Sequence, residues 1–268
     1  GTHCLKAQGP TPLNADSNFH DFHIRKGENI LAAVVRAGSR GWGFLCAKPR
    51  DPVVFREGKT WKPYRDSALE IIPGSALDLS AQNDAPAGKY GPAVLSPDGK
   101  AVFKHAPEQT VRLLGFSTYA LNGIMTIKDN GEFKAAVRRF AQAAKRQGYN
   151  LFRTQSFDRW LVLDSKQEYQ LNSFYLDRAD FLIAELKKQG IYIHLPIFNF
   201  SLFSRERNTF RDRTLHKFMM YFDGEWEMEH FRFAVKSLLE HVNPYTGVAW
   251  KDEPAIFCIE YYNEQSLG

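Results

Sequence analysis

Asn263 and Glu264 are the residues of this sequence best placed to do chemistry. They follow an apolar run that starts at Ala255, and its β-branched and aromatic side chains predict a buried strand over residues 255–260. A carboxylate at the end of such a strand can act as a general acid or base when its surroundings raise its pKa. Glu260 lies on the same side of this strand, and we predict that it pairs with an internal arginine and is not itself a catalyst.

Strands and helices alternate from residue 110 onward, so Glu264 belongs to a repeated βα pattern. Helical apolar spacing follows capping signals at Asp129 and Asn172. Both helices are predicted to end in a cationic pair, Gln and Gly, directly before a strand. This alternation indicates an α/β fold with a parallel sheet. The predicted strands cover residues 111–116, 149–154, 191–195 and 255–260, and a third helix covers roughly residues 225–240.

Two arrangements fit the four strands of residues 110–268. One is an open four-stranded sheet. The other is the first half of a (β/α)8 barrel, a fold that needs eight strands and typically about 250 residues. We favour the half barrel, truncated after strand 4, because only about 160 residues are present and the sequence ends before a helix could cover the last strand.

Polar side chains follow each predicted strand, at the end where barrels carry their functional groups. The set combines polar and aromatic residues with at least one acid, and the sequence has no glycine-rich phosphate loop. It therefore suits a neutral, hydroxyl-rich substrate better than a phosphate. The loop over residues 198–224 is expected to form a cleft wall or lid, or else a plain surface loop. The candidate residues are Ser117, Tyr119, Arg153, Gln155, Asp158, Trp160, Phe198, Asn199, Asn263 and Glu264.

The N-terminal part has a different composition. Residues 29–37 and 41–47 predict two strands, so we assign residues 1–72 to a β-rich segment. Residues 73–109 are rich in Pro, Gly, Asp and Ser and form a linker to the barrel segment 110–268. The linker is expected to wrap around the fold, because four of its apolar residues can become buried. These are Val94, Leu95, Val102 and Phe103.

The composition argues against several other classes. The net charge of +5 comes without a dense basic run, so nucleic-acid binding is not expected. The three cysteines are widely spaced and no HExxH motif is present, so neither a metal nor another cofactor is predicted. No apolar segment of about 18 residues predicts a membrane span, and no signal peptide is visible in the chain. His194, in mid-strand, is expected to be a satisfied core histidine.

The end of the last predicted strand resembles that of the clan A glycoside hydrolases. These are retaining enzymes that include cellulase-like and β-mannanase-like families. The resemblance rests on Asn263-Glu264 together with residues 241–247 and 250–255, and it extends to residues 84–91 of the linker. These longer stretches look like bacterial cellulase-like members.

The resemblance implies roles for individual residues. Glu264 is expected to be the general acid/base, with a raised pKa, and Asn263 to bind the 2-hydroxyl of the sugar. The clan's nucleophile comes from strand 7, outside this chain. The chain alone is therefore expected to be inactive, unless the missing C-terminal half of the barrel is supplied by another chain. Further substrate contacts are expected from Arg153, Asp158, Trp160 and Asn199.

The expected protein is thus a secreted or periplasmic bacterial glycoside hydrolase that acts on β-linked polysaccharides or oligosaccharides. Its first 72 residues resemble the end of a jelly-roll module of the carbohydrate-binding type. Two alternatives stay open. One is a non-catalytic carbohydrate-binding protein on a barrel scaffold, and the other is a different barrel or α/β enzyme, such as a metal-dependent hydrolase.

Overall fold

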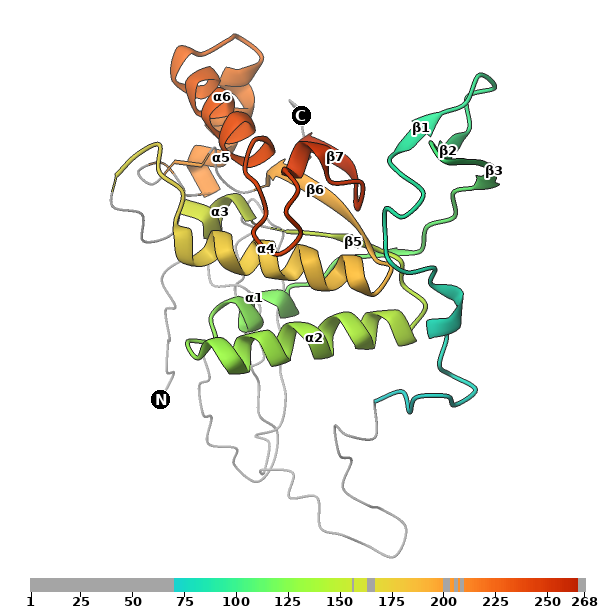
Figure 1. Ribbon diagram of the computed structural model, residues 1–268. Helices are drawn as coiled ribbons and strands as arrows, with labels where there is room; N and C mark the ends of the chain where they lie inside the picture. Colours follow the sequence, from blue (N-terminus) through green and yellow to red (C-terminus); the bar gives the residue numbers. More distant parts are fainter. Residues whose placement is uncertain are drawn as a thin grey trace, which may run out of the picture. The chain divides into compact units, whose positions relative to one another are not determined.

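The computed structural model divides into two compact units, residues 1–65 and 66–268. All described residues belong to the second unit (Figure 1). The predicted strands 29–37 and 41–47, and with them the jelly-roll prediction, lie outside the described residues. The structure describes residues 70–155, 157–162, 167–199, 203–204, 207 and 210–264.

A four-stranded parallel sheet organises this unit, with its strands side by side in chain order. Right-handed crossovers between strands in this order place their helices on one face of the sheet, whereas a doubly wound sheet reverses its order to use both faces. The arrangement is that of a barrel segment, and the α/β half-barrel expectation is confirmed at this level. The strands are β4 (Gly115–Phe116), β5 (Leu151–Arg153), β6 (Tyr192–Phe198) and β7 (Ile256–Tyr262).

Helices cover the sheet, and the two longest begin at the predicted caps. The Asp129 carboxylate accepts a hydrogen bond from the backbone N–H of Glu132, and the Asn172 side chain accepts from those of Phe174 and Tyr175. Both helices are followed by a glycine at positive φ. The helices are α1 (Ala120–Met125), α2 (Asn130–Arg146), α3 (Phe157–Val162), α4 (Ser173–Lys188), α5 (Phe210–Met220) and α6 (Glu225–Leu239).

Two predicted elements differ in the structure. The first predicted strand, residues 111–116, shrinks to the two residues of β4, because the Asn150 side chain bonds the backbone at Arg112 and Leu114 in place of a neighbouring strand. The predicted loop 198–224 contains a helix, α5, so its assignment as a loop throughout is wrong.

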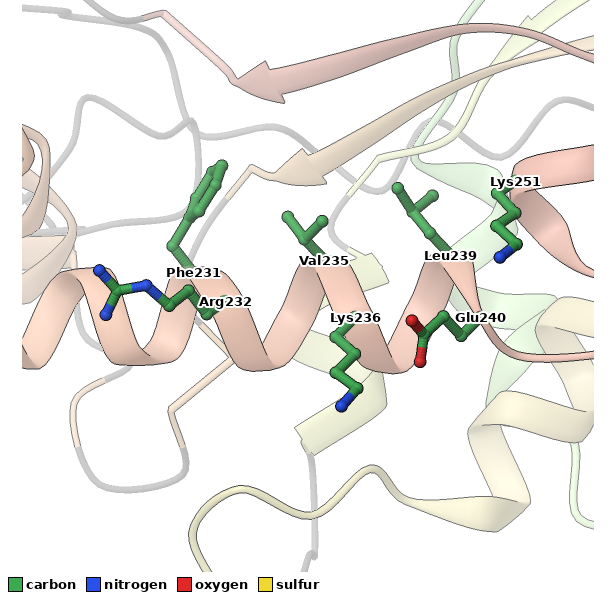
Figure 2. A pocket seen from close by; sticks show the side chains of 7 residues that line it. All are labelled: Phe231, Arg232, Val235, Lys236, Leu239, Glu240 and Lys251. Carbon is green, nitrogen blue, oxygen red and sulfur yellow. The ribbon is translucent and has the colours of Figure 1, made fainter.

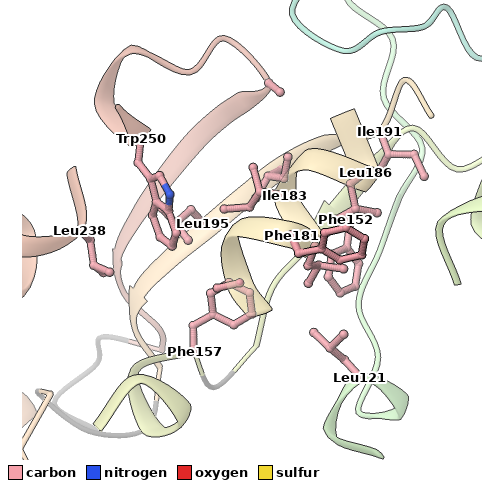
Figure 3. Packing of buried hydrophobic residues seen from close by; sticks show 14 of the residues in the cluster. Leu121, Phe152, Phe157, Phe181, Ile183, Leu186, Ile191, Leu195, Leu238 and Trp250 are labelled. Carbon is pink, nitrogen blue, oxygen red and sulfur yellow. The ribbon is translucent and has the colours of Figure 1, made fainter. Parts of the chain in front are cut away.

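The hydrophobic core lies between the sheet and the helices (Figure 3). Phe152 of β5 meets Phe140 of α2 edge to face, with ring centroids 5.4 Å apart, so this side of the sheet faces the helix layer. Trp250, in a short 3-10 helix before β7, is almost fully buried and donates to Asp180 of α4 through its indole N–H. The core therefore ties the last strand to the earlier βα units.

The segment predicted as a linker contains a small antiparallel sheet. Its strands are β1 (Ala93–Leu95), β2 (Ala101–Phe103) and β3 (Ala106–Thr110). Phe103 stacks on Tyr192, at the start of β6, with ring centroids 5.4 Å apart. Val102 and Phe103 are buried as predicted, but Val94 is 40% and Leu95 77% exposed, so the predicted burial of these two residues is wrong.

The same segment wraps around the N-terminal end of the parallel sheet. Leu79 donates from its backbone N–H to the carbonyl of Arg146, and Ala87 to that of Lys187, so the segment contacts the last residues of both α2 and α4. A Cβ at Gly148 would lie 3.2 Å from Leu79, and one at Gly190 would lie 3.0 Å from the Asp84 carbonyl. These contacts explain why a glycine follows each helix.

A groove of about 480 Å³ runs along α6 (Figure 2). Its apolar residues, Phe231, Val235 and Leu239, are spaced at one side of the helix and point toward the strands, while Arg232 and Lys236 point elsewhere. Within the described residues, no helix has the length and apolar character needed to cross a membrane.

Candidate active site

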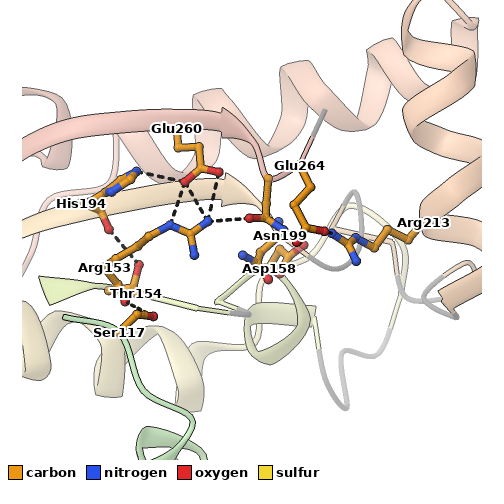
Figure 4. A network of polar contacts seen from close by, with 10 residues as sticks. Ser117, Arg153, Thr154, Asp158, His194, Asn199, Arg213, Glu260 and Glu264 are labelled. Atoms are coloured by element: carbon orange, nitrogen blue, oxygen red, sulfur yellow. Dashed lines mark hydrogen bonds and ion pairs between the residues drawn. The ribbon is translucent and has the colours of Figure 1, made fainter. Parts of the chain in front are cut away.

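A network of charged side chains lies on the face of the sheet opposite the helices (Figure 4). Arg153 of β5 stands in register with His194 of β6, and both share this face with Glu260 of β7. The Arg153 guanidinium donates through Nε and Nη2 to the two carboxylate oxygens of Glu260, at 2.9 and 3.0 Å. His194 Nε2 lies 3.0 Å from Oε2 of the same carboxylate. The prediction that Glu260 pairs with an internal arginine is confirmed.

Asn263 joins this network at the end of β7. Nη2 of Arg153 donates to Oδ1 of Asn263 at 2.7 Å, and the Asn263 backbone N–H donates to the Phe198 carbonyl at the end of β6. The side chain and backbone of Asn263 are therefore fixed by two different strands. A bidentate arginine–carboxylate pair of this kind is among the stronger and more directional contacts in proteins.

Glu264 lies just beyond the network and is exposed, with 71% of its side chain accessible. Its Oε2 is 2.7 Å from Nη2 of Arg213 on α5, and Nζ of Lys217 donates to its backbone carbonyl. Its φ of 54° turns the chain away from the strand. Glu264 therefore contacts α5, a helix in the region that the sequence analysis expected to be a loop.

The charges around Glu264 set its pKa. The hydrogen bond and charge of Arg213 hold the pKa of this carboxyl below its ordinary value, and the charges of Lys217 and Arg153 act in the same direction. The sequence analysis expected a raised pKa, and in this structure that expectation is wrong because the charged groups acting on Glu264 are all cations.

His194 was expected to be a core histidine, but it is only partly buried. About a quarter of its side chain is exposed. Burial lowers its pKa, the neighbouring Glu260 opposes this, and the charge of Arg153 lowers the pKa further. The imidazole is therefore kept neutral at neutral pH and contacts Glu260 through Nε2. Its position in mid-strand gave no signal for this contact.

Asp158 and Asn199 contact each other, but Asp158 has no exposed surface. Oδ2 of Asp158 accepts from the backbone N–H of Asn199 at 3.0 Å, and Oδ1 accepts from the N–H of Arg159. The carboxylate thus joins α3 to the end of β6. Asn199 itself is half-buried beside the network (Figure 4).

The Trp160 side chain contacts α1 and α4. Its indole N–H lies 3.3 Å from Oδ1 of Asn122 on α1, and its ring packs 5.2 Å from that of Tyr175 on α4. Ser117, the residue after β4, donates to the Arg153 carbonyl at 3.2 Å. Tyr119, after β4, is 71% exposed.

Arg213 and Lys217 contact Glu264, although the sequence analysis did not include them among the candidate site residues. They are spaced four residues apart, which places them on the same side of a helix. This spacing would have predicted a shared helix face, but residues 198–224 were expected to form a loop. In the described ranges of the chain, no three His, Cys, Asp or Glu side chains group as a metal site requires.

Comparisons with known proteins identify relatives. The chain is 34% identical over 168 residues to mannan endo-1,4-beta-mannosidase 3 of Oryza sativa subsp. japonica, which covers 58% of this chain and 34% of the relative. It is 32% identical over 168 residues to mannan endo-1,4-beta-mannosidase 4 of the same plant, covering 58% of this chain and 35% of the relative. The chain thus spans about a third of the length of these curated relatives. No protein-family model matches it.

Two solved structures are similar in part. An endo-1,4-beta-mannanase from Rhizomucor miehei matches with 19% identity and a TM-score of 0.47, over 65% of this chain and 48% of that one. An endo-1,4-beta-D-mannanase from Thermotoga petrophila RKU-1 matches with 21% identity and a TM-score of 0.41, over 57% and 45%. At these scores the fold assignment rests on the parallel sheet itself. The resemblance to glycoside hydrolases of the mannanase kind is confirmed by the curated relatives, while the bacterial cellulase-like detail stays a prediction.

Proposed function

We propose that this chain, a relative of the mannan endo-1,4-beta-mannosidases, forms the acid/base half of a retaining glycoside hydrolase that acts on β-linked glycans. One observation carries the proposal. The Asn263-Glu264 pair follows the fourth strand of a parallel sheet in chain order, and the Arg153–Glu260 pair holds Asn263 there. A barrel places its catalytic residues at this end of its strands.

Glu264 is the proposed general acid/base. It would protonate the leaving oxygen and later activate water, while a second carboxylate about 5–5.5 Å away forms the covalent intermediate. We propose that this second carboxylate comes from strand 7 of the barrel, as the resemblance implies, because Glu260, the acid beside Asn263 among the described residues, is already bound to Arg153 and His194. A nearby negative charge would also raise the pKa of Glu264 against the effect of Arg213. The chain alone is therefore proposed to be inactive.

The proposed partner is the C-terminal half of a barrel. The groove along α6 supports this, because Phe231 in its lining packs against Phe198 of β6 and Tyr261 of β7, the last strand of the described sheet. In a βα series, the next helix packs beside the preceding one, and an amphipathic helix would bury Phe231, Val235 and Leu239.

The proposed substrate is a polysaccharide of β-1,4-linked mannose, since both curated relatives are named as mannan endo-1,4-beta-mannosidases. Asn263 is proposed to contact the sugar, and Asn199 is proposed to line the same site because it follows Phe198, whose carbonyl accepts from the Asn263 backbone. Asp158 and Trp160 are proposed to act indirectly, because their side chains position α3. Because the proposed substrate is a polymer, we propose that the enzyme is secreted.

A second candidate function is non-catalytic binding of carbohydrate. The ion pair between Arg213 and Glu264 favours it, because a carboxylate held ionised by a cation is a poor proton donor. The Glu264 carboxylate of this pair could still accept a hydrogen bond from a sugar hydroxyl.

Hydrolysis by the full-length gene product that carries this chain tests the proposal. We expect cleavage of β-1,4-mannan, and proton NMR of the first product should show the β-anomer. Product of the α-anomer would exclude retention, and mannan binding without any cleavage would support the second candidate. The same assay on residues 66–268 alone should show no cleavage.

A further inference from the structure

Helix α5 carries the two cations that contact Glu264, so the position of this helix decides what surrounds the proposed acid/base. Nη2 of Arg213 lies 2.7 Å from the Glu264 carboxylate, and Nζ of Lys217 donates to the Glu264 carbonyl. The Tyr262 hydroxyl also donates to the Arg213 carbonyl, but at 3.4 Å this bond to β7 is long. His216 is fully buried, and because successive helix residues lie about 100° apart, it leaves α5 on a different side from Lys217. One side of α5 thus contacts Glu264 while another is held in the interior.

The buried side of α5 is bound to α6 through His216. Its Nδ1 lies 3.1 Å from Oε1 of Glu227, whose side chain is only 5% exposed. Because an ionised carboxylate has only acceptors, Nδ1 is the donor of this bond. The His216 ring also stacks on that of Trp226, with ring centroids 4.7 Å apart and the planes inclined by 17°. The second ring nitrogen, Nε2, is buried and has no hydrogen-bond partner among the described residues, so within them Glu227 is the partner that fixes the ring.

The partner side of this contact, on α6, is fixed in turn. Trp226 packs against His230 with ring centroids 3.8 Å apart, and Nδ1 of His230 lies 2.9 Å from the Trp226 carbonyl. Nε2 of His230 lies 2.7 Å from Oε1 of Glu168, which belongs to the segment between α3 and α4. A Cβ at Gly224, directly before α6, would clash with the Glu227 carboxylate, so the start of α6 leaves room for that group. The start of α6 therefore offers α5 a partner that is itself held at several points.

From these contacts we infer that His216 is a positioning residue: it binds Glu227 and stacks on Trp226, and so holds α5 where Arg213 reaches Glu264. His216 acts through the helix, because its own side chain is turned toward α6. The inference rests on the proposed function, since the charge state of Glu264 affects activity through the role of this residue as acid/base. It places a control point of the site in the interior between two helices, away from the end of the sheet.

The pKa of Glu264 reports the position of α5. Three cations lower this pKa, namely Arg213 and Lys217 of α5 and Arg153 of β5. Because two of them belong to α5, displacement of the helix should raise the pKa toward its ordinary value. A general acid is active only while protonated, so activity is lost as pH rises through this pKa. Loosening α5 should therefore move the basic limb of the kcat/KM profile to higher pH.

His216→Phe tests this role in the full-length gene product, with an aryl β-mannoside as the substrate. Phenylalanine keeps a ring against Trp226 but cannot donate to Glu227, so the buried carboxylate loses this hydrogen bond. We expect the basic limb to move to higher pH, in the same direction as in Arg213→Met. When Arg213→Met is already present, His216→Phe should move the limb much less, because the stronger of the two α5 cations is then absent.

Further variants separate positioning from general damage. His216→Asn keeps an N–H near the place of Nδ1, so its limb should stay closer to the original pH than that of His216→Phe. Glu227→Gln keeps an acceptor without the charge and should give a smaller shift, which can be measured if His216→Phe does not fold. His241→Phe removes a different histidine–carboxylate pair, with Asp180 of α4 at 2.7 Å, and should lower stability but leave the limb in place. A limb unmoved in Glu227→Gln and in every folded His216 variant would overturn the inference, as would an equal shift in His241→Phe.

A titration without turnover keeps the inference separate from the proposed function. The ¹³C NMR signal of the Glu264 carboxyl, identified by its loss in Glu264→Gln, should titrate below the ordinary range in the unaltered protein and at higher pH in His216→Phe and Glu227→Gln. This shift without hydrolysis of any mannoside would remove the proposed function and leave the role of His216 standing. An unchanged titration in these variants, with hydrolysis intact, would overturn the role of His216 and leave the proposed function.

Discussion

The two ends of the parallel sheet are built from different chemistry. At the N-terminal end, the wrapping segment packs backbone against glycines and a buried ring against Tyr192. At the C-terminal end, an arginine, a histidine and an amide surround Glu260, and cations surround Glu264. Tight packing tolerates little change, whereas a polar edge can change without unfolding the chain. We therefore assign a stabilising role to the N-terminal end of the sheet and a functional role to its C-terminal end, as in barrels generally.

The largest loss of stability is expected at a buried ion pair of the N-terminal end. Glu253 has a side chain only 1% exposed, and its carboxylate binds Lys187 at 2.8 Å. Glu253→Gln leaves the ammonium group without its charged partner, and should lower the free energy of unfolding by about 3 kcal/mol. Urea denaturation measures it. Asp98→Asn, which removes an exposed pair with Lys100, is the control and should have no measurable effect.

A glycine pair separates packing from backbone strain. Gly88 and Gly99 have φ values of 82° and 79°, but a Cβ at Gly88 would lie 2.8 Å from Pro254 Cγ, while one at Gly99 meets nothing within 4 Å. Alanine at either site carries the same backbone cost. Gly88→Ala should therefore cost about 2 kcal/mol more than Gly99→Ala. Equal unfolding midpoints for the two variants would show that the wrapping segment does not pack as described.

At the opposite end, removal of Arg213 should change pH dependence more than stability. Arg213 lowers the pKa of Glu264, and a general acid is active only while protonated. Activity is therefore lost as pH rises through this pKa, and Arg213→Met should move that basic limb to higher pH. The profile of kcat/KM against pH in the full-length gene product measures it. Lys217→Met should shift the limb less, and an unmoved limb in both variants would exclude Glu264 as its source.

The smallest effect is expected in the small sheet, at Leu95. This side chain is 77% exposed, so Leu95→Ser should change the free energy of unfolding by less than about 0.5 kcal/mol. Phe103→Ala, in the neighbouring strand, should cost about 3 kcal/mol because its ring is buried against Tyr192. Thermal unfolding of the two variants compares them directly, and similar losses would mean that both faces of this sheet are covered.

The sequence predicted the elements whose signals are local. Caps at Asp129 and Asn172 and the glycines at 148 and 190 define α2 and α4, and the βα alternation indicates the parallel sheet. The small antiparallel sheet was missed although Asp98-Gly99 is a hairpin signal, because a Pro- and Gly-rich composition also fits a linker. Local patterns carry no information on which side the sheet will bury, so Leu95 and Phe103 looked alike.

The candidate site was predicted in part. The strand-end rule brought Arg153 and Asn263 together, and side-chain alternation placed Glu260 beside the arginine. The rule also selected Asp158, which binds the backbone of Asn199 at the end of β6, and Trp160, which contacts α1 and α4. Arg213 reaches Glu264 from 51 positions away in the sequence, and such a long-range ion pair leaves no mark on local spacing. The sign of the Glu264 pKa shift depends on that contact.

The most direct test of the account is the proton that Glu264 is proposed to donate. Glu264→Gln in the full-length gene product is assayed on aryl β-mannosides whose leaving groups range from basic to highly acidic phenols. The account predicts a loss of about 10²- to 10⁴-fold for basic leaving groups, which need the proton, and a much smaller loss for the most acidic ones, which do not. Equal losses across the series, or unchanged rates throughout, would contradict the assignment of Glu264 as the acid/base.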